Sequence, residues 1–379
     1  MKNITKIIIS GIVVAVFLYF FVSLQVKKEI ASEMTTPDFM MELNDVRLRG
    51  WDKEKTAWEL IATQAYYYDK NNVVLLAIRD GSFLDNKGDN LMKSISVATV
   101  NANIFKKEII LNEVSLDLKS ESQERVVLRA DSLRYLAGVF SSETSFSLMV
   151  GGWQISSGKL DFDTNENVIF LSNKVIITKD KNLLHSDTGV YSSVSNLLKL
   201  KDKVSVEYLV SEKGKEYKLF VSAGEADILL GEKESEVVFG KGLVFRLGED
   251  VLQARDGKYN QITKLMHINE AIIRVNDGTQ ILNNIDKEDI TGSSIRANNL
   301  DINFQQKIVN LVGGVVYERK ERKVLATKGT YDVEKGLLFM HENVQILDGN
   351  KTIKANAVDV DVKNDVIVAK GNVKTKLKI

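Results

Sequence analysis

The chain has 379 residues, and its 51 Lys and Arg balance its 51 Asp and Glu, so the formal net charge is zero. This balance provides no basic footprint for nucleic acid, and the absence of Cys excludes disulfides, thiolate metal sites and Cys nucleophiles. A single Pro excludes a Pro-rich linker between domains.

Residues 7–26 read IIISGIVVAVFLYFFVSLQV and carry no charge. A helix of this length spans roughly 30 Å, the hydrocarbon thickness of a bilayer. We expect an uncleaved transmembrane helix here, between a cytoplasmic tail at 1–6 and a linker at 27–38. A cleaved signal peptide is the alternative, although such a peptide has a shorter apolar region and a small-residue cleavage site. The exit, SLQVKKEIASEM, has neither an Ala-x-Ala site nor a lipobox Cys.

From about residue 150 onward the chain repeats one set of spacings. An aromatic or branched residue at position zero follows a small residue by five positions, precedes a turn-forming residue by one, and has apolar residues six and thirteen positions after it. Position zero is occupied by Phe162, Tyr191, Tyr259, Ile302, Tyr331 and Val360, and the small residues are Ser157, Ser186, Ala254, Ala297, Ala326 and Ala355. Several of the small residues are 29 positions apart, and a fixed period of this length indicates stacked supersecondary units.

Within each unit the apolar residues alternate with polar ones, which is the pattern of a half-buried strand rather than a helix. The residues between positions zero and plus six are rich in Asp, Asn, Ser, Gly and Lys, as expected of a hairpin loop. A second break falls at plus eleven and plus twelve. Each unit is therefore expected to be an antiparallel hairpin whose return strand bends. The segment 221–247 looks like a degenerate further unit, and residues 39–152 show the same strand character with looser spacing.

Where position zero is Tyr, the residue two positions earlier is Gly, as at Gly189, Gly257 and Gly329. Two explanations remain open at this point. Either a small residue makes room for the large ring on one packed face, or the Gly marks a strand bulge.

The chain ends in GNVKTKLKI, in which Val373, Thr375, Leu377 and Ile379 alternate with lysines. Alternating Lys protects an exposed strand edge from aggregation. Such an edge can also accept a strand from another subunit. The sequence predicts an edge strand and leaves both roles open.

We expect no enzymatic activity, metal or cofactor. His341 begins the sequence HENVQ, in which Gln345 replaces the second His of a zincin helix. The Asp161-x-Asp163-x-Asn165 sequence starts like a calcium loop but lacks the required Gly and bidentate Glu. The sequence also contains no P-loop and no nucleophile-elbow motif.

The N-terminal apolar segment, the phrase WELIATQAYY at Trp58–Tyr67 and the A…GxYD…L…NV units resemble the lipopolysaccharide-export families LptC and LptA (the OstA-like superfamily). Residues 39–152 resemble LptC, and residues 153–379 resemble LptA. The chain departs from LptC in being much longer, as if an LptA-like stretch were continuous with the first part.

This resemblance implies an all-β fold, a twisted antiparallel β-jellyroll of about 29-residue hairpin repeats with an apolar interior slot. It implies a single-pass inner-membrane protein with its bulk in the periplasm of a diderm bacterium. Lipopolysaccharide acyl chains would pass through the slot from the inner-membrane ABC transporter toward the outer membrane. An LptA-like or outer-membrane LptD-like jellyroll would pair with it edge to edge. The alternative is a structural β-solenoid for adhesion, with a filled core.

The repeat frame predicts which side chains face the slot. For each of them, an ordinary core position is the alternative. The predicted lining residues are Phe162, Ile169, Leu171, Val175, Tyr191, Leu198, Val204, Tyr259, Ile272, Ile302, Val315, Tyr331, Leu338, Val344 and Val373.

Overall fold

A computed structural model describes residues 41–52, 55–69, 71–85, 88–120, 124–212, 215–231, 236–247, 250–260, 262–275 and 292–377. The expected transmembrane helix at 7–26, its flanking segments and Ile379 lie outside these residues. Over the described ranges, no helix is long and apolar enough to cross a membrane.

The described chain forms one sheet of 28 antiparallel strands, which confirms the all-β prediction. The first strands are β1 (Met41–Asp52), β2 (Lys55–Tyr67), β3 (Asn72–Phe83), β4 (Met92–Ser96), β5 (Thr99–Asn103), β6 (Glu108–Leu118), β7 (Val126–Leu136), β8 (Val139–Ser142), β9 (Phe146–Val150) and β10 (Trp153–Ser156). They are followed by β11 (Lys159–Asp163), β12 (Val168–Ser172), β13 (Val175–Lys179), β14 (Asn182–Ser186), β15 (Thr188–Ser192), β16 (Leu197–Glu212), β17 (Lys215–Leu229), β18 (Glu236–Gly240) and β19 (Leu243–Leu247). The last are β20 (Asp250–Asn260), β21 (Leu265–Val275), β22 (Ser293–Asn303), β23 (Ile308–Arg319), β24 (Arg322–Asp332), β25 (Leu337–Asp348), β26 (Lys351–Asp361), β27 (Val366–Lys370) and β28 (Lys374–Leu377).

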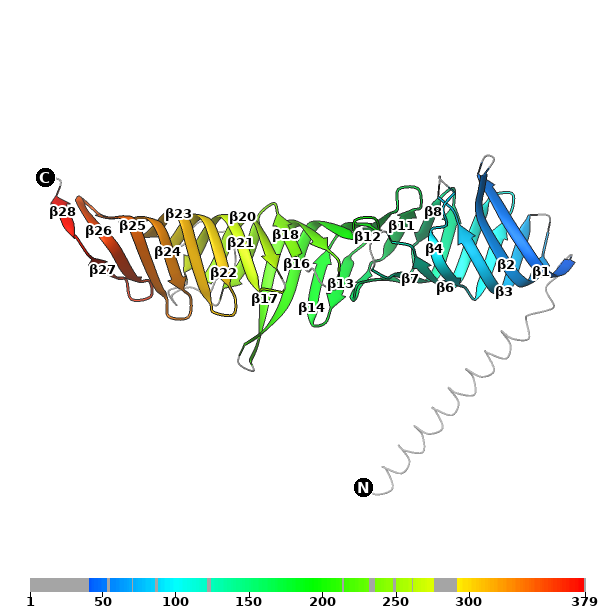
Figure 1. Ribbon diagram of the computed structural model, residues 1–379, viewed down its shortest axis with the longest axis horizontal. Coiled ribbons are helices and arrows are strands. Elements are labelled where there is room, and N and C mark those ends of the chain that lie inside the picture. The colour runs from blue at the N-terminus through cyan, green and yellow to red at the C-terminus, as the bar shows by residue number, and fades with distance from the viewer. Residues whose placement is uncertain are drawn as a thin grey trace, which may run out of the picture.

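Strands that are close in sequence lie side by side, so the sheet extends along one axis from β1 to β28 (Figure 1). Strand β24 illustrates the arrangement, because it pairs along its length with β23 before it and with β25 after it. Each long strand thus forms one step of a meander, and the molecule is much longer than it is wide (Figure 1).

Most steps of the meander have a kink near the middle. In β23 the kink falls at Gly313 and Gly314, with φ of 80° and 59°, and the register with β24 shifts there. In β25 it falls at Glu342 and Asn343, with φ of 65° and 55°. These pairs are positions plus eleven and plus twelve of their units, so the second break in the sequence pattern is a β-bulge.

The kinks divide the sheet into two walls. Wall 1 holds the half-strands next to the turns at 304–307, 333–336 and 362–365, and wall 2 holds those next to the turns at 320–321 and 349–350. From β8 to β15 the halves are separate strands. For example, β12 pairs with β15 in wall 1, whereas β13 pairs with β14 in wall 2.

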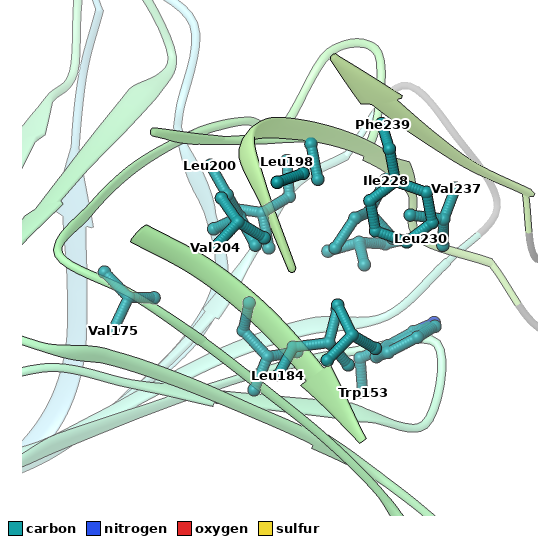
Figure 2. Close-up of a cluster of buried hydrophobic side chains, with 14 of the residues drawn as sticks. Trp153, Val175, Leu184, Leu198, Leu200, Val204, Ile228, Leu230, Val237 and Phe239 are labelled. Carbon is teal, nitrogen blue, oxygen red and sulfur yellow. The ribbon is translucent and has the colours of Figure 1, made fainter. Parts of the chain in front are cut away.

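The inner faces of the two walls meet. Phe83 of wall 2 contacts Phe140 of wall 1 with ring centroids 4.7 Å apart, and Tyr208 of wall 2 contacts Tyr259 of wall 1 at 4.9 Å. Figure 2 shows the same arrangement in the middle of the chain, where Leu184 and Trp153 of wall 2 face a group that includes Ile228 of wall 1. The buried side chains form one hydrophobic cluster that runs from Trp58 to Val362.

The turns of wall 1 explain the turn-forming residue at plus one. In the turn after β24, the Asp332 carboxylate accepts a 3.0 Å hydrogen bond from the Lys335 amide. Asn303 accepts the equivalent amides of its own turn at 3.0 Å. The turns are also joined to one another, because the Val333 amide donates to the Lys307 carbonyl at 3.1 Å and the Val362 amide to the Gly336 carbonyl at 2.9 Å. Side-chain oxygens of Asp and Asn satisfy turn amides in this way.

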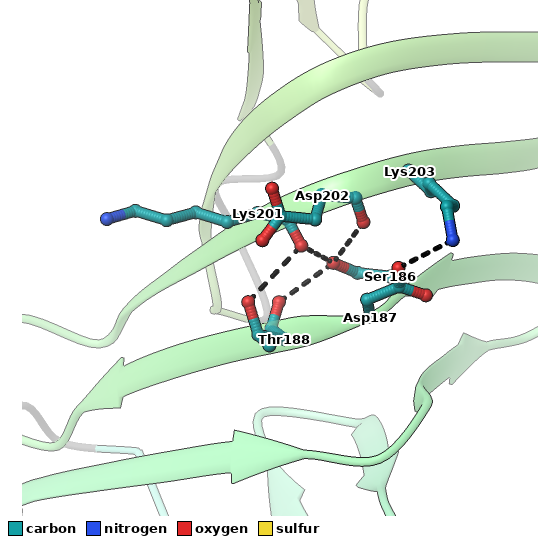
Figure 3. Close-up of polar contacts among 6 residues, drawn as sticks. All are labelled: Ser186, Asp187, Thr188, Lys201, Asp202 and Lys203. Carbon is teal, nitrogen blue, oxygen red and sulfur yellow. Dashed lines mark hydrogen bonds and ion pairs between the residues drawn. The ribbon is translucent and has the colours of Figure 1, made fainter.

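The small residue at minus five lies at the kink. Ser186 is buried there, and its hydroxyl donates to the carbonyl of Lys201 at 2.6 Å, with the carbonyl of Thr188 also within reach at 2.8 Å (Figure 3). The Asp187 amide donates to the Asp202 carbonyl at 3.0 Å. The two walls diverge at this position, so it suits a small side chain. A hydroxyl here can also donate to a backbone carbonyl beside the bulge.

The structure also decides between the two explanations for the Gly before Tyr. Gly189, Gly257 and Gly329 keep regular register with both neighbouring strands. A Cβ on Gly257 would lie 2.7 Å from Cδ2 of Leu243, and one on Gly329 would lie 3.4 Å from Cδ1 of Leu311. These glycines therefore do not mark bulges, and at Gly257 the missing side chain makes room for Leu243.

Candidate functional site

The candidate site is the apolar interior between the two walls. All but two of the predicted lining residues are buried in it, at 2% exposure or less. The buried ones are Phe162, Ile169, Leu171, Val175, Tyr191, Leu198, Val204, Tyr259, Ile302, Val315, Tyr331, Leu338 and Val344. They come from both walls, because positions zero to plus nine lie in wall 1 and position plus thirteen lies in wall 2.

Ile272 is the first exception. It is only half-buried and stands in register with Gln253 and Arg296, whereas its neighbour Ile273 is fully buried. The cause is the kink of β21, which contains one residue of positive φ, Glu270, where β25 contains two. One residue fewer reverses the inward and outward positions of the half-strand that follows. The prediction for Ile272 is wrong, and Ile273 takes the inward position.

Val373 is the second exception, because it is 50% exposed and lies just before β28. The last two strands pair with β26 alone among the described residues, β27 with its wall 1 half and β28 with its wall 2 half. Thr375 stands in register with Ile353, which packs against the core, so its strand continues the inner face. Val373, Thr375 and Leu377 are all exposed at this end.

The interior is filled with side chains. Leu60, Leu148, Ile177 and Val309 are spread along the chain, and each has no exposed surface. In the described part of the chain, the walls therefore meet without the open slot that the resemblance implies. Side chains of about 0% exposure on both faces leave no space wide enough for water between them.

The interior is less covered at the two ends of the sheet. At one end Leu43 is 36% exposed, although it stands in register with the fully buried Ala65. At the other, Ile367 is only partly buried, although it stands in register with the fully buried Val360. Strand β1 pairs with β2 alone within the described ranges, so both ends also present an unpaired strand edge.

Three of the residues at position zero are buried tyrosines, and two of them donate hydrogen bonds to polar side chains. Tyr191 donates to Asn196 at 2.9 Å, and Tyr331 donates to the Asp250 carboxylate at 2.7 Å. Burial raises the pKa of Tyr259 to about 12. Burial also raises the pKa of Tyr331, and the charge of Asp250 adds to this effect.

The sequence did not predict a polar group inside the C-terminal part of the interior. Arg319 donates from Nη1 to the Val362 carbonyl at 2.8 Å, and its guanidinium lies 3.9 Å from Asp365. Tyr317 is fully buried beside them. Burial raises the pKa of Tyr317 most and Asp365 raises it further, while Arg319 lowers it. Tyr317 is at position plus fifteen of the unit whose position zero is Ile302. The same position in the next unit is Ile346, which is apolar, so the repeat pattern did not indicate a polar group at Tyr317.

The three histidines lie on different strands. His267 is exposed on wall 1 and its Nδ1 lies 2.7 Å from Asp301, as expected for a surface residue. His341 lies beside Glu342 and stacks on Phe339. Among the residues that the structure describes, no three or more His, Cys, Asp or Glu gather as metal ligands would.

No family model matches the chain, and no curated protein matches it.

Proposed function

We propose that this protein is a membrane-anchored periplasmic component of a lipopolysaccharide-export bridge, folded as a twisted β-jellyroll of hairpin units. It would pass lipopolysaccharide from an inner-membrane ABC transporter toward the outer membrane. The observation that carries the proposal is the apolar interior, which forms one cluster from Trp58 to Val362 along a sheet whose outer edges are unpaired within the described residues.

Acyl chains would enter this interior by parting the walls. Each methylene that leaves water gains about 0.8 kcal/mol, and a chain between the walls replaces apolar side-chain contacts by apolar contacts. Parting would separate ring pairs such as Tyr208 and Tyr259, whose centroids lie 4.9 Å apart. Apart from the polar groups around Tyr331 and Arg319, the buried residues of the described inner faces are mostly apolar, so these faces suit an apolar guest that must also move on.

The two ends support the bridging part of the proposal. Exposed apolar side chains lie beside each unpaired edge, Met41 at 53% on β1 and Val366 at 50% on β27. An unpaired edge strand offers backbone hydrogen bonds to a strand of another molecule. An LptA-like or LptD-like partner would continue both the sheet and its inner face.

A structural role, as a rigid β-solenoid for adhesion, is the second candidate function. The filled interior favours it, because a solenoid needs a dry core and no guest.

Site-specific photo-crosslinking in cells distinguishes the two functions. The crosslinker is placed at Tyr259 or Leu338, which are buried between the walls, and at their exposed sequence neighbours Lys258 and Phe339 as matched controls. The export function predicts lipopolysaccharide adducts at Tyr259 and Leu338 and none at the controls. Adducts with protein alone at both Tyr259 and Leu338 would contradict the export function and favour the solenoid function.

A further inference from the structure

Two polar contacts join the walls near the C-terminal end. The first links Tyr331 of wall 1 to Asp250 of wall 2, with the Tyr331 hydroxyl donating to Oδ2 at 2.7 Å. Tyr331 has no exposed surface and Asp250 only 5%. A buried carboxylate requires hydrogen-bond donors to offset the loss of its hydration.

The second contact links Arg319, the last residue of β23 in wall 2, to the turn after β26 in wall 1. Its Nη1 donates to the carbonyl of Val362 at 2.8 Å, and Val362 itself is fully buried. Asp365 of the same turn lies 3.9 Å from Nε of Arg319 and 3.5 Å from Nη1 of Arg322. One carboxylate of wall 1 thus faces two guanidinium groups of wall 2.

Tyr317 lies in β23, two residues before Arg319, and has no exposed surface. The two contacts therefore join residues of β20 and β23 in wall 2 to residues of β24 and of the turn after β26 in wall 1.

We propose that Tyr331–Asp250 and Arg319 with Val362 and Asp365 form a clasp that holds the walls together and controls opening of the C-terminal interior. Most of the interior is closed by apolar contacts, which lose little when an apolar guest replaces them. Opening at the clasp instead breaks a hydrogen bond to a buried carboxylate and one from a guanidinium, which opposes separation. The clasp follows from these contacts alone, and its test contains no lipid.

The absence of Cys from the chain makes the test direct, because a single introduced Cys is the only thiol. Val324→Cys places it in wall 2, where Val324 is fully buried and in register with Tyr317. The rate at which a thiol reagent labels this Cys in the full-length protein measures opening near the clasp. Val126→Cys, fully buried in wall 2 at the start of β7, serves as a distant probe.

Tyr331→Phe removes the clasp hydroxyl and keeps the ring. Tyr259→Phe is its matched control, since Tyr259 is a buried tyrosine at the same repeat position. We expect Tyr331→Phe to increase labelling at Val324→Cys about tenfold, the effect of losing a hydrogen bond to a charged group. Tyr259→Phe should change it less than about threefold. Arg319→Lys, which keeps the charge but loses the planar guanidinium, should act like Tyr331→Phe.

The distant probe distinguishes local opening from general unfolding. An unchanged rate at Val126→Cys in the Tyr331→Phe background supports the clasp. Equal increases at both probes, or equal effects of Tyr331→Phe and Tyr259→Phe at Val324→Cys, would overturn it.

Discussion

The hydroxyl of Ser186 donates a 2.6 Å hydrogen bond to the carbonyl of Lys201, and this contact lies at the kink that separates the two walls. Ser186→Ala leaves the small size intact and removes the donor, so it should lower the free energy of unfolding by about 1 kcal/mol. Ser205→Ala, on an exposed side chain two residues beyond the bulge, should change it by less than about 0.5 kcal/mol. Urea unfolding of both variants measures the difference, and equal values would show that the hydroxyl does not support the kink.

Gly257→Ala should destabilise the protein by about 1–3 kcal/mol, because the new Cβ would lie 2.7 Å from Cδ2 of Leu243. Shortening the neighbour by Leu243→Val should make the same Ala substitution less harmful. In a double-mutant cycle measured by urea unfolding, we expect a coupling of about 1 kcal/mol. Additive effects would mean that Gly257 is required for its backbone conformation instead.

Ile273→Ala should cost about 2–5 kcal/mol, as expected for truncation of a fully buried aliphatic side chain. Ile272→Ala, one residue earlier on a half-buried side chain, should cost less than half as much. Thermal unfolding of the pair therefore tests which of the two residues faces the interior. A larger loss of stability for Ile272→Ala would instead place Ile272 in the interior, as the repeat spacing predicts.

The turns of wall 1 should make stability depend on acidic pH. Lys335 holds the pKa of Asp332 below its usual value, first through its side chain and then through its amide, and Asn364 acts in the same way on Asp361. Because the folded-state pKa values are lowered, the contribution to stability is complete above about pH 4–5 and is lost as the pH falls through the folded values.

The double variant Asp332→Asn with Asp361→Asn tests this expectation. Asn already occupies the equivalent position at Asn260, where its side chain accepts the amides of Ile262 and Thr263 at 2.9 Å. The double variant should therefore keep its turns and show a shallower loss of thermal stability between about pH 5 and pH 2. An unchanged pH profile would exclude these carboxylates as its source.

Val373→Glu and Leu377→Glu should abolish binding of a jellyroll partner, because each puts a charge on the exposed apolar side of the terminal edge. Both side chains are about half-exposed, so the melting temperature should change little. Phe105→Glu, on an 81% exposed side chain in a turn far along the chain, is the matched control. Retained pull-down with the purified partner in both edge variants would refute the edge contact.

The repeat spacing was sufficient to predict strands, turns and most buried positions. Alternation assigned Ile169 and Leu171 to the interior, where both are buried, and Phe170 between them is 49% exposed. The residue after position zero predicted turns because Asp and Asn satisfy turn amides, as Asp332 does. These features depend only on residues that are close together in the sequence, so they can be predicted from the sequence alone.

The contacts between the walls could not be predicted in this way. Tyr331 meets Asp250, 81 residues away, because the strands of the two walls are staggered, and no periodicity specifies that stagger. The same reason applies to the filled interior, since alternation predicts an apolar face but not the distance to the opposite one. Ile272 was misplaced because the number of residues in a bulge is set by local backbone conformation at Glu270.

In the described part of the chain, each long step of the meander forms its ladder hydrogen bonds with the strands before and after it, as β24 does with β23 and β25. A gene that gains or loses 29 codons at a turn would therefore add or remove two whole strands without disturbing the pairing elsewhere. At about 4.8 Å per strand, the molecule would change length by about 10 Å each time. The length of the molecule would therefore change by whole repeats, and shorter or longer versions would require no new fold.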